Sequence, residues 1–442
     1  MIVSPRFDSS GKNKPRWIGA FTVMTVMTLA GCGGDDDKSE TTHTDTHIES
    51  EGRIAVYDAE AQAVKVLSLD NGQTLHSVAL PGSTPRLYSS PDYRYSVVIQ
   101  RDEDRVSFID GGLYTEDHGD HLHDYAETPQ LQSLFLSASK PTHYTVNESG
   151  QGNVAIIFFD GSDNAQASIS IFSDSSLNVG QELASMGLEN RMHGVAKLID
   201  DKVYVTYRDA AITDTTLPAE VERYAFNDGN LQLETRYDTA CPRLHGAGYN
   251  ESMLAFGCSD GLLVVDLTQP ELPASKRPNP AELEADSRIG TVYGHHDVAD
   301  LIGRAGNQFF VVSPSASDDN YPLLSLAEGV SSVAQGFAKE GERFYILGDD
   351  GILRLFDPQS DWQEVGQLQV IDPLTAEAVA PSVVASNHNE TLILLDPAKQ
   401  EVVVIDTHEL SVHQRFALDF SAQGLAWMGI EDHEQGDDHS HD

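Results

Sequence analysis

Basic side chains are scarce in this chain of 442 residues, in which 28 lysines and arginines stand against 69 aspartates and glutamates. The formal net charge is −41. A surface of that sign repels phosphate backbones and anionic lipid headgroups, so nucleic acid and anionic membrane surfaces are excluded as partners. The same field attracts cations, although it also keeps a protein in solution without any further purpose.

Long hydrophobic runs are also scarce. The one marked apolar stretch covers residues 17–30, and at about 14 residues it is shorter than a bilayer span. It follows four basic residues and ends in Leu29-Ala-Gly-Cys32, the pattern of a bacterial lipoprotein signal. We expect residues 1–31 to be a lipoprotein signal peptide and Cys32 to carry lipid, which places the protein in the periplasm, anchored to a membrane. An uncleaved helical anchor is the alternative.

Only three cysteines are present. Cys241 and Cys258 lie in one repeat and flank two expected strands, without a CxxC spacing. Because disulfides persist in an exported protein, we expect these two cysteines to be bonded to each other. A thiolate metal site is the alternative.

Convincing amphipathic helices are missing as well, and short β-rich runs alternate with turn residues over nearly the whole chain. Several strands end in aspartate, as in Arg53-Ile-Ala-Val-Tyr-Asp58 and Val402-Val-Val-Ile-Asp406. Repeats of about 40–50 residues are typical of β-propeller blades. We predict an all-β chain with one propeller of eight blades, or seven with an irregular insertion, whose ring is closed by the C-terminal strand Gly424–Gly429. Innermost strands are expected near Arg86, His143, His193, His245, His296, Gln335, Ser382 and Gly424.

The expected domain organisation follows from composition. Residues 32–52 form a flexible polar tether, residues 53–430 the propeller, and residues 431–442 an acidic tail that contains histidine. Nothing in the sequence indicates a second domain.

Histidines recur about fifty residues apart, each next to a short strand: His143, His193, His245 and His296, the last preceded by His295. Equivalent positions of propeller blades gather around one central channel. The four recurring histidines are therefore predicted to form a ring of imidazoles that can bind a metal ion. For each histidine alone, a hydrogen-bonding role at the rim of a strand is the alternative.

An insertion at residues 114–127 interrupts one blade after Asp110. His118, His121 and His123 alternate there with aspartates, including Asp120. A flexible loop with this spacing can offer several nitrogen and carboxylate ligands to one ion, a set that suits Zn²⁺ but does not exclude Cu²⁺ or Ni²⁺. An ordinary acidic surface loop is the alternative.

These motifs together resemble the AztD family of periplasmic zinc metallochaperones. The resemblance runs from about Arg53 to Gly429. It is carried by Glu116-Asp-His-Gly-Asp-His-Leu-His-Asp124, Arg191-Met-His-Gly194, Cys241-Pro-Arg-Leu-His-Gly246, Phe256-Gly-Cys258-Ser-Asp-Gly261 and Tyr293-Gly-His-His-Asp297. It implies a β-propeller that hands Zn²⁺ to the solute-binding protein of a zinc ABC importer, with the histidine-rich loop as capture element and the channel histidines as a tighter site. The lipoprotein signal departs from a freely diffusing chaperone.

The function expected from the sequence is zinc capture and transfer by a monomer, without catalysis. One alternative is a metal-dependent hydrolase of the lactonase type, with Asp297 as general base beside an open metal position. Another is a propeller that only binds other proteins, with structural histidines.

Overall fold

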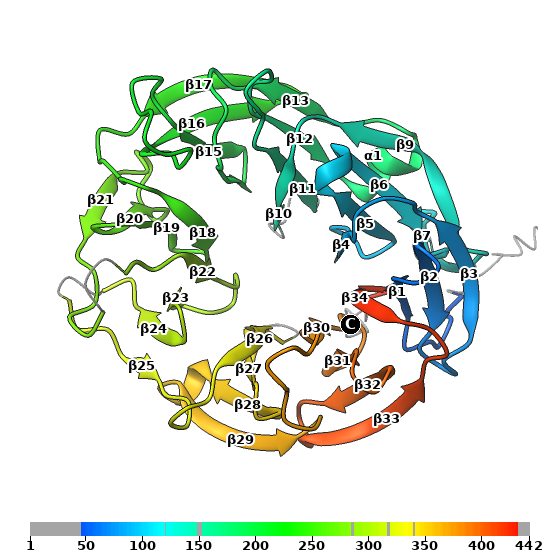
Figure 1. Cartoon of the computed structure of the whole chain (residues 1–442). Helices are drawn as coiled ribbons and strands as arrows, with labels where there is room; N and C mark the ends of the chain where they lie inside the picture. Colours follow the sequence, from blue (N-terminus) through cyan, green and yellow to red (C-terminus); the bar gives the residue numbers. More distant parts are fainter. Residues whose placement is uncertain are drawn as a thin grey trace, which may run out of the picture. The chain divides into compact units, whose positions relative to one another are not determined.

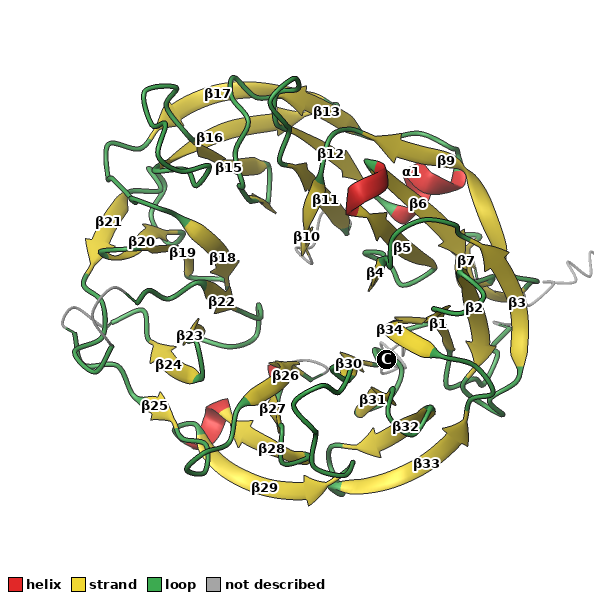
Figure 2. Cartoon of the chain, in the orientation of Figure 1, coloured by secondary structure: helices red, strands yellow, loops and turns green. Residues whose placement is uncertain are grey.

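Eight four-stranded antiparallel sheets surround a central channel in the part of the chain that the structure describes (Figure 1). The structure is a computed structural model that describes residues 46–119, 121–147, 153–283, 287–315, 319–338 and 341–431. All of them lie in the compact unit of residues 44–442. Strands make up nearly all of the regular structure (Figure 2). The prediction of an all-β propeller with eight blades is confirmed.

The blades follow one another along the chain, and within each blade the strands run in order from the innermost to the outermost. The first four blades are β34 (Ala422–Met428), β1 (Arg53–Asp58), β2 (Ala63–Ser68) and β3 (Thr74–Ala79); β4 (Arg86–Ser89), β5 (Tyr95–Gln100), β6 (Arg105–Asp110) and β9 (Gln130–Ser137); β10 (Pro141–Asn147), β11 (Val154–Phe159), β12 (Ser168–Phe172) and β13 (Ala184–Gly187); and β14 (Ala196–Ile199), β15 (Lys202–Tyr207), β16 (Glu220–Asn227) and β17 (Asn230–Arg236).

The other four are β18 (His245–Tyr249), β19 (Met253–Cys258), β20 (Gly261–Asp266) and β21 (Ala274–Arg277); β22 (Thr291–Tyr293), β23 (Leu301–Ala305), β24 (Gln308–Val312) and β25 (Leu323–Leu324); β26 (Ser332–Phe337), β27 (Phe344–Gly348), β28 (Ile352–Asp357) and β29 (Gln363–Gln369); and β30 (Ser382–Ala385), β31 (Thr391–Asp396), β32 (Glu401–Asp406) and β33 (Ser411–Ala417). Short helices α1 (Asp174–Asn178), η1 (Arg101–Glu103) and η3 (Pro358–Ser360) lie between strands.

The two middle strands of a blade are packed on both faces, because each sheet lies between two neighbouring sheets. All six residues of β5 and of β11 are buried, which explains apolar runs such as Val-Ala-Ile-Ile-Phe-Phe. Outermost strands such as β9 alternate between exposed and partly buried residues, since one face meets water. The core is therefore a series of apolar layers between adjacent blades.

The ring closes between the two ends of the described chain, as predicted. The last strand β34 pairs antiparallel with β1, with Arg53 opposite Met428 and Asp58 opposite Ala422. Trp427 is fully buried at this junction, and its indole N–H donates to the carbonyl oxygen of Glu51 at 3.1 Å. Closure of this kind leaves no open sheet edge at the start or end of the propeller.

The histidine-rich insertion is a regular β-hairpin, whereas the sequence suggested a flexible loop. Strands β7 (Leu113–Asp117) and β8 (Leu122–Ala126) pair in register, with Glu116 opposite His123. The residues that precede the propeller join this hairpin, because Thr46 forms a parallel bridge with His123 and Ile48 N–H donates to Asp124 at 2.9 Å. Residues 46–52, assigned to the tether from composition, thus contact the domain. The signal, Cys32 and the rest of the tether lie outside the described residues, as do residues 432–442.

The predicted disulfide between Cys241 and Cys258 is confirmed. It joins the segment before β18 to the end of β19, and both cysteines are fully buried.

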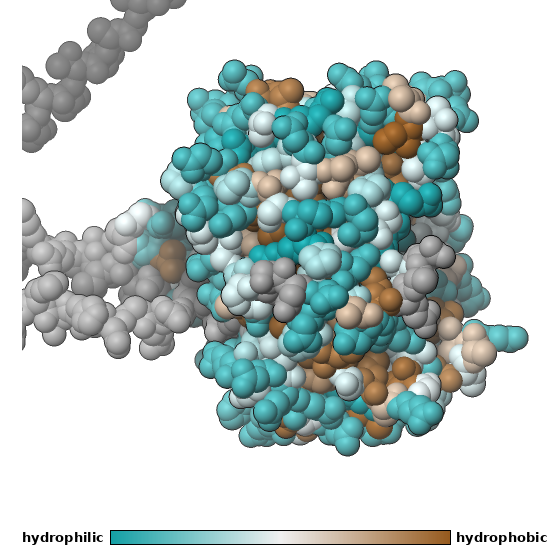
Figure 3. All heavy atoms as spheres, turned by 90° about the vertical axis from the view of Figure 1, so that its left-hand side faces the viewer, coloured by the Kyte–Doolittle hydropathy of each residue, from teal (hydrophilic) through white to brown (hydrophobic). Residues whose placement is uncertain are grey.

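No helix among the described residues is long and apolar enough to cross a membrane. The side of the ring that carries β21 is largely hydrophilic, with scattered apolar side chains (Figure 3).

Candidate metal centre

Three adjacent blades bring His143, His193 and His245 together at one end of the channel. His143 and His245 stand at the starts of the innermost strands β10 and β18, and His193 lies just before β14. The register shifts at the start of both β10 and β18, between Pro141 and His143 and between His245 and Ala247. Such bulges re-aim side chains next to functional sites.

The backbone requires glycine at the positions that follow His193 and His245. Gly246 has φ +74°, and a Cβ there would lie 2.4 Å from the carbonyl oxygen of Gly290. A Cβ at Gly194 would lie 2.4 Å from Thr206 Oγ1 and 2.5 Å from the Phe158 ring. Only glycine allows the chain this close to its neighbours, so the repeated His-Gly pair fixes the path of the backbone beside His193 and His245.

The three Nε2 atoms converge. The distance from Nε2 of His193 is 3.4 Å to Nε2 of His143 and 3.2 Å to Nε2 of His245, and one ligand nitrogen from each ring lies within 4.8 Å of the others. Nitrogen ligands about 2.0–2.1 Å from a tetrahedral Zn²⁺ are about 3.3–3.4 Å apart. Both spacings from His193 therefore fit a trihistidine zinc site.

Two of the rings are oriented by partners at their other nitrogen. His245 Nδ1 lies 2.7 Å from the carbonyl oxygen of Gly290, and His193 Nδ1 lies 2.9 Å from Oδ2 of Asp160. A carbonyl oxygen only accepts, so His245 Nδ1 must donate, which leaves the Nε2 lone pair for a metal. Asp160 is buried and is itself held by Arg101 at 3.0 Å. Partners of this kind orient most metal-bound histidines.

Burial favours the neutral form of two of the three imidazoles. Desolvation and the neighbouring His193 and His245 lower the pKa of His143 to about 3, and burial lowers the pKa of His245. A neutral imidazole is the form that binds metal, so protons compete weakly at these two nitrogens near neutral pH.

Because of His143, the free energy of unfolding of the metal-free protein is predicted to decrease as the pH is lowered. In the unfolded chain this group takes up a proton near pH 6.5, whereas in the folded protein it stays neutral down to about pH 3. The lowered pKa therefore leaves stability unaffected above pH 6.5 and costs stability as pH falls below it. We expect the urea midpoint of a His143→Gln variant to fall less than that of the unsubstituted protein between pH 7.5 and pH 5. Equal losses in the two proteins would contradict this assignment.

His295 and His296 lie elsewhere, and here the structure corrects the expected four-membered ring. They follow the innermost strand β22, whereas the other three histidines precede or begin theirs. Innermost strands run side by side in the same direction: His245 lies beside Gly290, while Gly294 lies beside the carbonyl of Tyr249. Four residues of extended chain separate these levels, which is about 13 Å. His296 is therefore towards the opposite end of the channel.

At that end His295, His296 and Asp297 form a second group whose ligand atoms lie within 4.8 Å of one another. His296 Nε2 is 2.9 Å and His295 Nδ1 is 3.7 Å from Asp297 Oδ2. Both histidines line a cavity of about 750 Å³ in the channel, together with Tyr249 and Tyr293. The sequence pattern identified both histidines as candidate ligands, but it did not predict that they lie apart from the trihistidine cluster.

The hairpin histidines are neighbours but are more loosely arranged. Ring centroids are 5.1 Å apart for His118 and His121, 6.0 Å for His118 and His123, and 6.5 Å for His121 and His123. They do not form a group as tight as the two above in the described residues, and Asp120 lies outside these. The hairpin follows the third strand of its blade, so it projects from the same end of the ring as His295 and His296.

The orienting residues of the trihistidine cluster were not found from the sequence. Asp160 follows β11 in a Phe-Asp-Gly turn that looks like any other turn, and its partner His193 belongs to the next blade. Gly290 contributes only a carbonyl oxygen, which no side-chain pattern reveals.

Asp160→Asn is predicted to weaken zinc binding by about 10- to 100-fold, because the amide loses the charge that orients His193 and pairs with Arg101. Competition with a chromophoric chelator measures the affinity. Asp163→Asn is the matched control, since Asp163 is exposed and pairs with Arg191 instead. Equal affinities of the two variants would show that Asp160 does not support the cluster.

Fold and site together define an eight-bladed β-propeller with three convergent histidines at one end of its channel. The resemblance seen in the sequence is confirmed: the chain is 24% identical over 405 residues to the zinc chaperone AztD of Citrobacter koseri, covering 88% of this chain and 89% of that protein. The structure of apo AztD from Citrobacter koseri superposes with a TM-score of 0.67 at 22% identity, over 85% of this chain and 98% of the other. A second Citrobacter koseri AztD structure gives the same TM-score, over 86% and 99% of the two chains.

The fold is shared more widely. Dihydro-heme d1 dehydrogenase NirN matches with a TM-score of 0.55 at 11% identity, over 88% of this chain and 78% of that one. No protein-family model matches the sequence.

Proposed function

We propose that this protein is a zinc metallochaperone that binds Zn²⁺ at His143, His193 and His245. The observation that carries the proposal is that Nε2 of His193 lies 3.2 and 3.4 Å from Nε2 of His245 and of His143, distances that match those between ligands on one tetrahedral zinc ion. Similarity to a zinc chaperone over 88% of the chain supports it. Cu²⁺ and Ni²⁺ also bind imidazole, so the proposed selectivity for zinc depends on supply as well as on geometry.

Transfer needs a site that an acceptor can enter. Three protein ligands leave the fourth zinc position open, so a ligand of the acceptor can bind before the histidines let go. We propose the solute-binding protein of a zinc ABC importer as this acceptor. The protein would then work in the periplasm as a monomer, held at a membrane through lipid on Cys32.

The other histidines are proposed to catch zinc at the opposite end of the ring. His118, His121 and His123, with Asp120, offer a looser set of ligands on the hairpin, and His295 and His296 offer a second set at the cavity. Because these sets and the trihistidine cluster lie at different ends of the channel, zinc would pass between them through the channel or through solution rather than by direct exchange.

For the hydrolase alternative, neither candidate carboxylate is placed to act as a general base at the trihistidine cluster. Asp297 lies at the other end of the channel and pairs with His296. Asp160, the carboxylate beside the cluster, faces Nδ1 of His193 and Arg101 instead of the Nε2 side where a metal-bound water would stand. We therefore propose binding and release without turnover.

The test is zinc retention followed by transfer. The full-length chain, loaded with zinc and dialysed, is expected to keep about one zinc in the trihistidine cluster and to pass it to a metal-free importer solute-binding protein faster than to solution. His76→Ala is a control, because this histidine lies on the outermost strand β3. Loss of all zinc on dialysis would refute the metal-binding function, and retained zinc that never reaches the acceptor would refute the chaperone function.

A further inference from the structure

Beneath the histidine hairpin lies a separate cavity whose charge is not balanced. Its volume is about 370 Å³, and it is lined from four parts of the chain: the turn after β4, the start of β7, helix α1 and the end of the chain after β34. Its acidic side chains are Asp92, Glu116, Asp174 and Glu431, against one arginine, Arg94. Among the described residues, no histidine or cysteine lines it.

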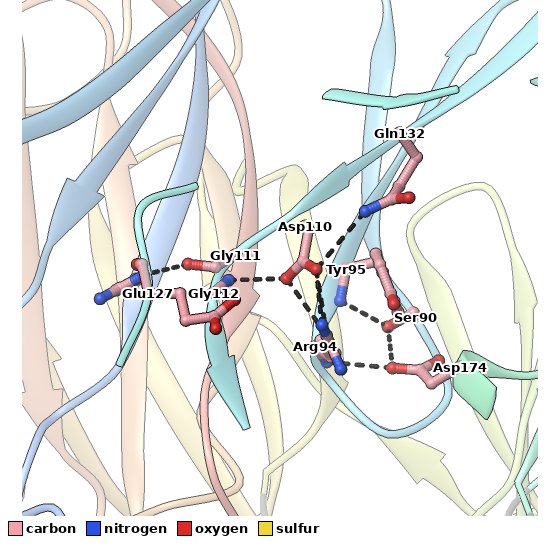
Figure 4. A network of polar contacts seen from close by, with 10 residues as sticks. Ser90, Arg94, Tyr95, Asp110, Gly111, Gly112, Glu127, Gln132 and Asp174 are labelled. Atoms are coloured by element: carbon pink, nitrogen blue, oxygen red, sulfur yellow. Dashed lines mark hydrogen bonds and ion pairs between the residues drawn. The ribbon is translucent and has the colours of Figure 1, made fainter. Parts of the chain in front are cut away.

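Arg94 does not neutralise this group, because its guanidinium is occupied elsewhere. Its Nε and Nη2 atoms contact Oδ2 of Asp110 at 3.1 and 2.8 Å (Figure 4). Its Cζ atom also lies 3.5 Å from the centroid of the Tyr114 ring. Asp110 also accepts from the backbone N–H of Gly112 at 2.8 Å, which fixes the start of the hairpin. The positive charge is thus committed to holding β6 and β7 together.

Asp174 is the unusual member of the cavity. Its side chain is buried, and its Oδ2 accepts from Ser90 Oγ at 2.6 Å and from the backbone N–H of Arg94 at 3.1 Å (Figure 4). Its Oδ1 is buried as well and has no hydrogen-bond partner. A buried carboxylate oxygen without a partner is costly unless a proton or a cation satisfies it. Burial and the nearby charge of Asp92 raise the pKa of Asp174 to about 7, although hydrogen bonds from Ser90 and from the backbone of Arg94 act in the opposite direction.

We propose that this cavity binds a hard divalent cation, Ca²⁺, through Asp174 Oδ1 and the carboxylate of Asp92. Glu116 on β7, Ser175 and Asn178 line the same cavity and would supply further oxygen donors. Such a set suits Ca²⁺, which takes six to eight oxygens, and does not favour Zn²⁺, which prefers nitrogen and sulfur. This proposal does not rest on the proposed zinc function.

A cation at this position would have a structural consequence for the hairpin. Asp92 and Asp174 belong to neighbouring blades, and Glu116 belongs to the strand that leads to His118. One ion bound to all three would therefore fix the base of the histidine hairpin to the propeller. The amides of residues 114–117 would exchange more slowly when the ion is bound.

The experiment compares the full-length chain, freed of metal with a chelator, with and without CaCl2. We expect saturable binding of one Ca²⁺ by calorimetry, a higher unfolding temperature and slower exchange in β7. Asp174→Asn and Asp92→Asn should each weaken Ca²⁺ binding at least about tenfold. Because asparagine keeps the shape of the side chain and removes the buried charge, Asp174→Asn should fold without calcium.

Asp228→Asn is the matched control, since Asp228 is exposed in the turn between β16 and β17 and should leave Ca²⁺ binding unchanged. His193→Ala should also leave it unchanged, which separates this site from the zinc cluster. Absence of Ca²⁺ binding, or binding that persists in Asp174→Asn, would overturn the proposal. Zn²⁺ binding that depends on Asp174 and is not displaced by Ca²⁺ would overturn the assignment to a hard cation.

Discussion

His193→Ala is expected to weaken zinc binding by more than about 100-fold, because His193 is the central member of the cluster. Its Nε2 lies within 3.4 Å of both other Nε2 atoms, and its Nδ1 is held by Asp160. Loss of an orienting partner alone typically costs about 10- to 100-fold, so loss of the ligand itself should cost more. Competition against a chelator of known affinity measures the change.

His118→Ala is the comparison for that result. It removes an imidazole from the hairpin at the other end of the ring and should leave the tightly bound zinc in place. If the hairpin variant lost the tight zinc and the His193 variant kept it, the two sites would have been assigned the wrong way round.

Trp427→Ala is expected to lower the free energy of unfolding by about 3–5 kcal/mol, the range for removal of a fully buried large aromatic side chain. The indole packs in the apolar layer between the blades of β31 and β1, and it contacts the ring of Tyr93 at a centroid distance of 5.3 Å. Urea unfolding followed by circular dichroism gives the change.

Val379→Ala serves as the reference for this loss, since Val379 is half exposed in a loop and should change stability by less than about 0.5 kcal/mol. A Trp427 variant as stable as this reference would mean that the last strand contributes little to ring closure.

The blades could be predicted because each leaves a local signal. A buried middle strand such as β11 must be apolar throughout, and turns with aspartate or glycine separate it from its neighbours. The closing strand could be predicted because the propeller sequence starts in the middle of a blade. The outermost strand of the β22 sheet could not, since β25 has only two residues.

The position of His296 shows where periodicity stops being informative. Two short apolar segments, Thr291–Tyr293 and Leu301–Ala305, lie on either side of it, and either could be the innermost strand by composition. Choosing the second places His296 before the strand and in the ring, while the structure uses the first. Contacts between blades, such as that of Asp160 with His193, depend on folded distances that no local pattern contains.

The closing strand also affects when the propeller can become complete. Because β34 is made last and yet forms the innermost strand of the blade that β1–β3 begin, this blade stays unfinished until the chain has been synthesised as far as Met428. Until then the inner edge of β1 is exposed, as an open template for pairing with another chain. A product truncated before Ala422 would keep that edge permanently, and it should self-associate even though seven of its blades have all their strands.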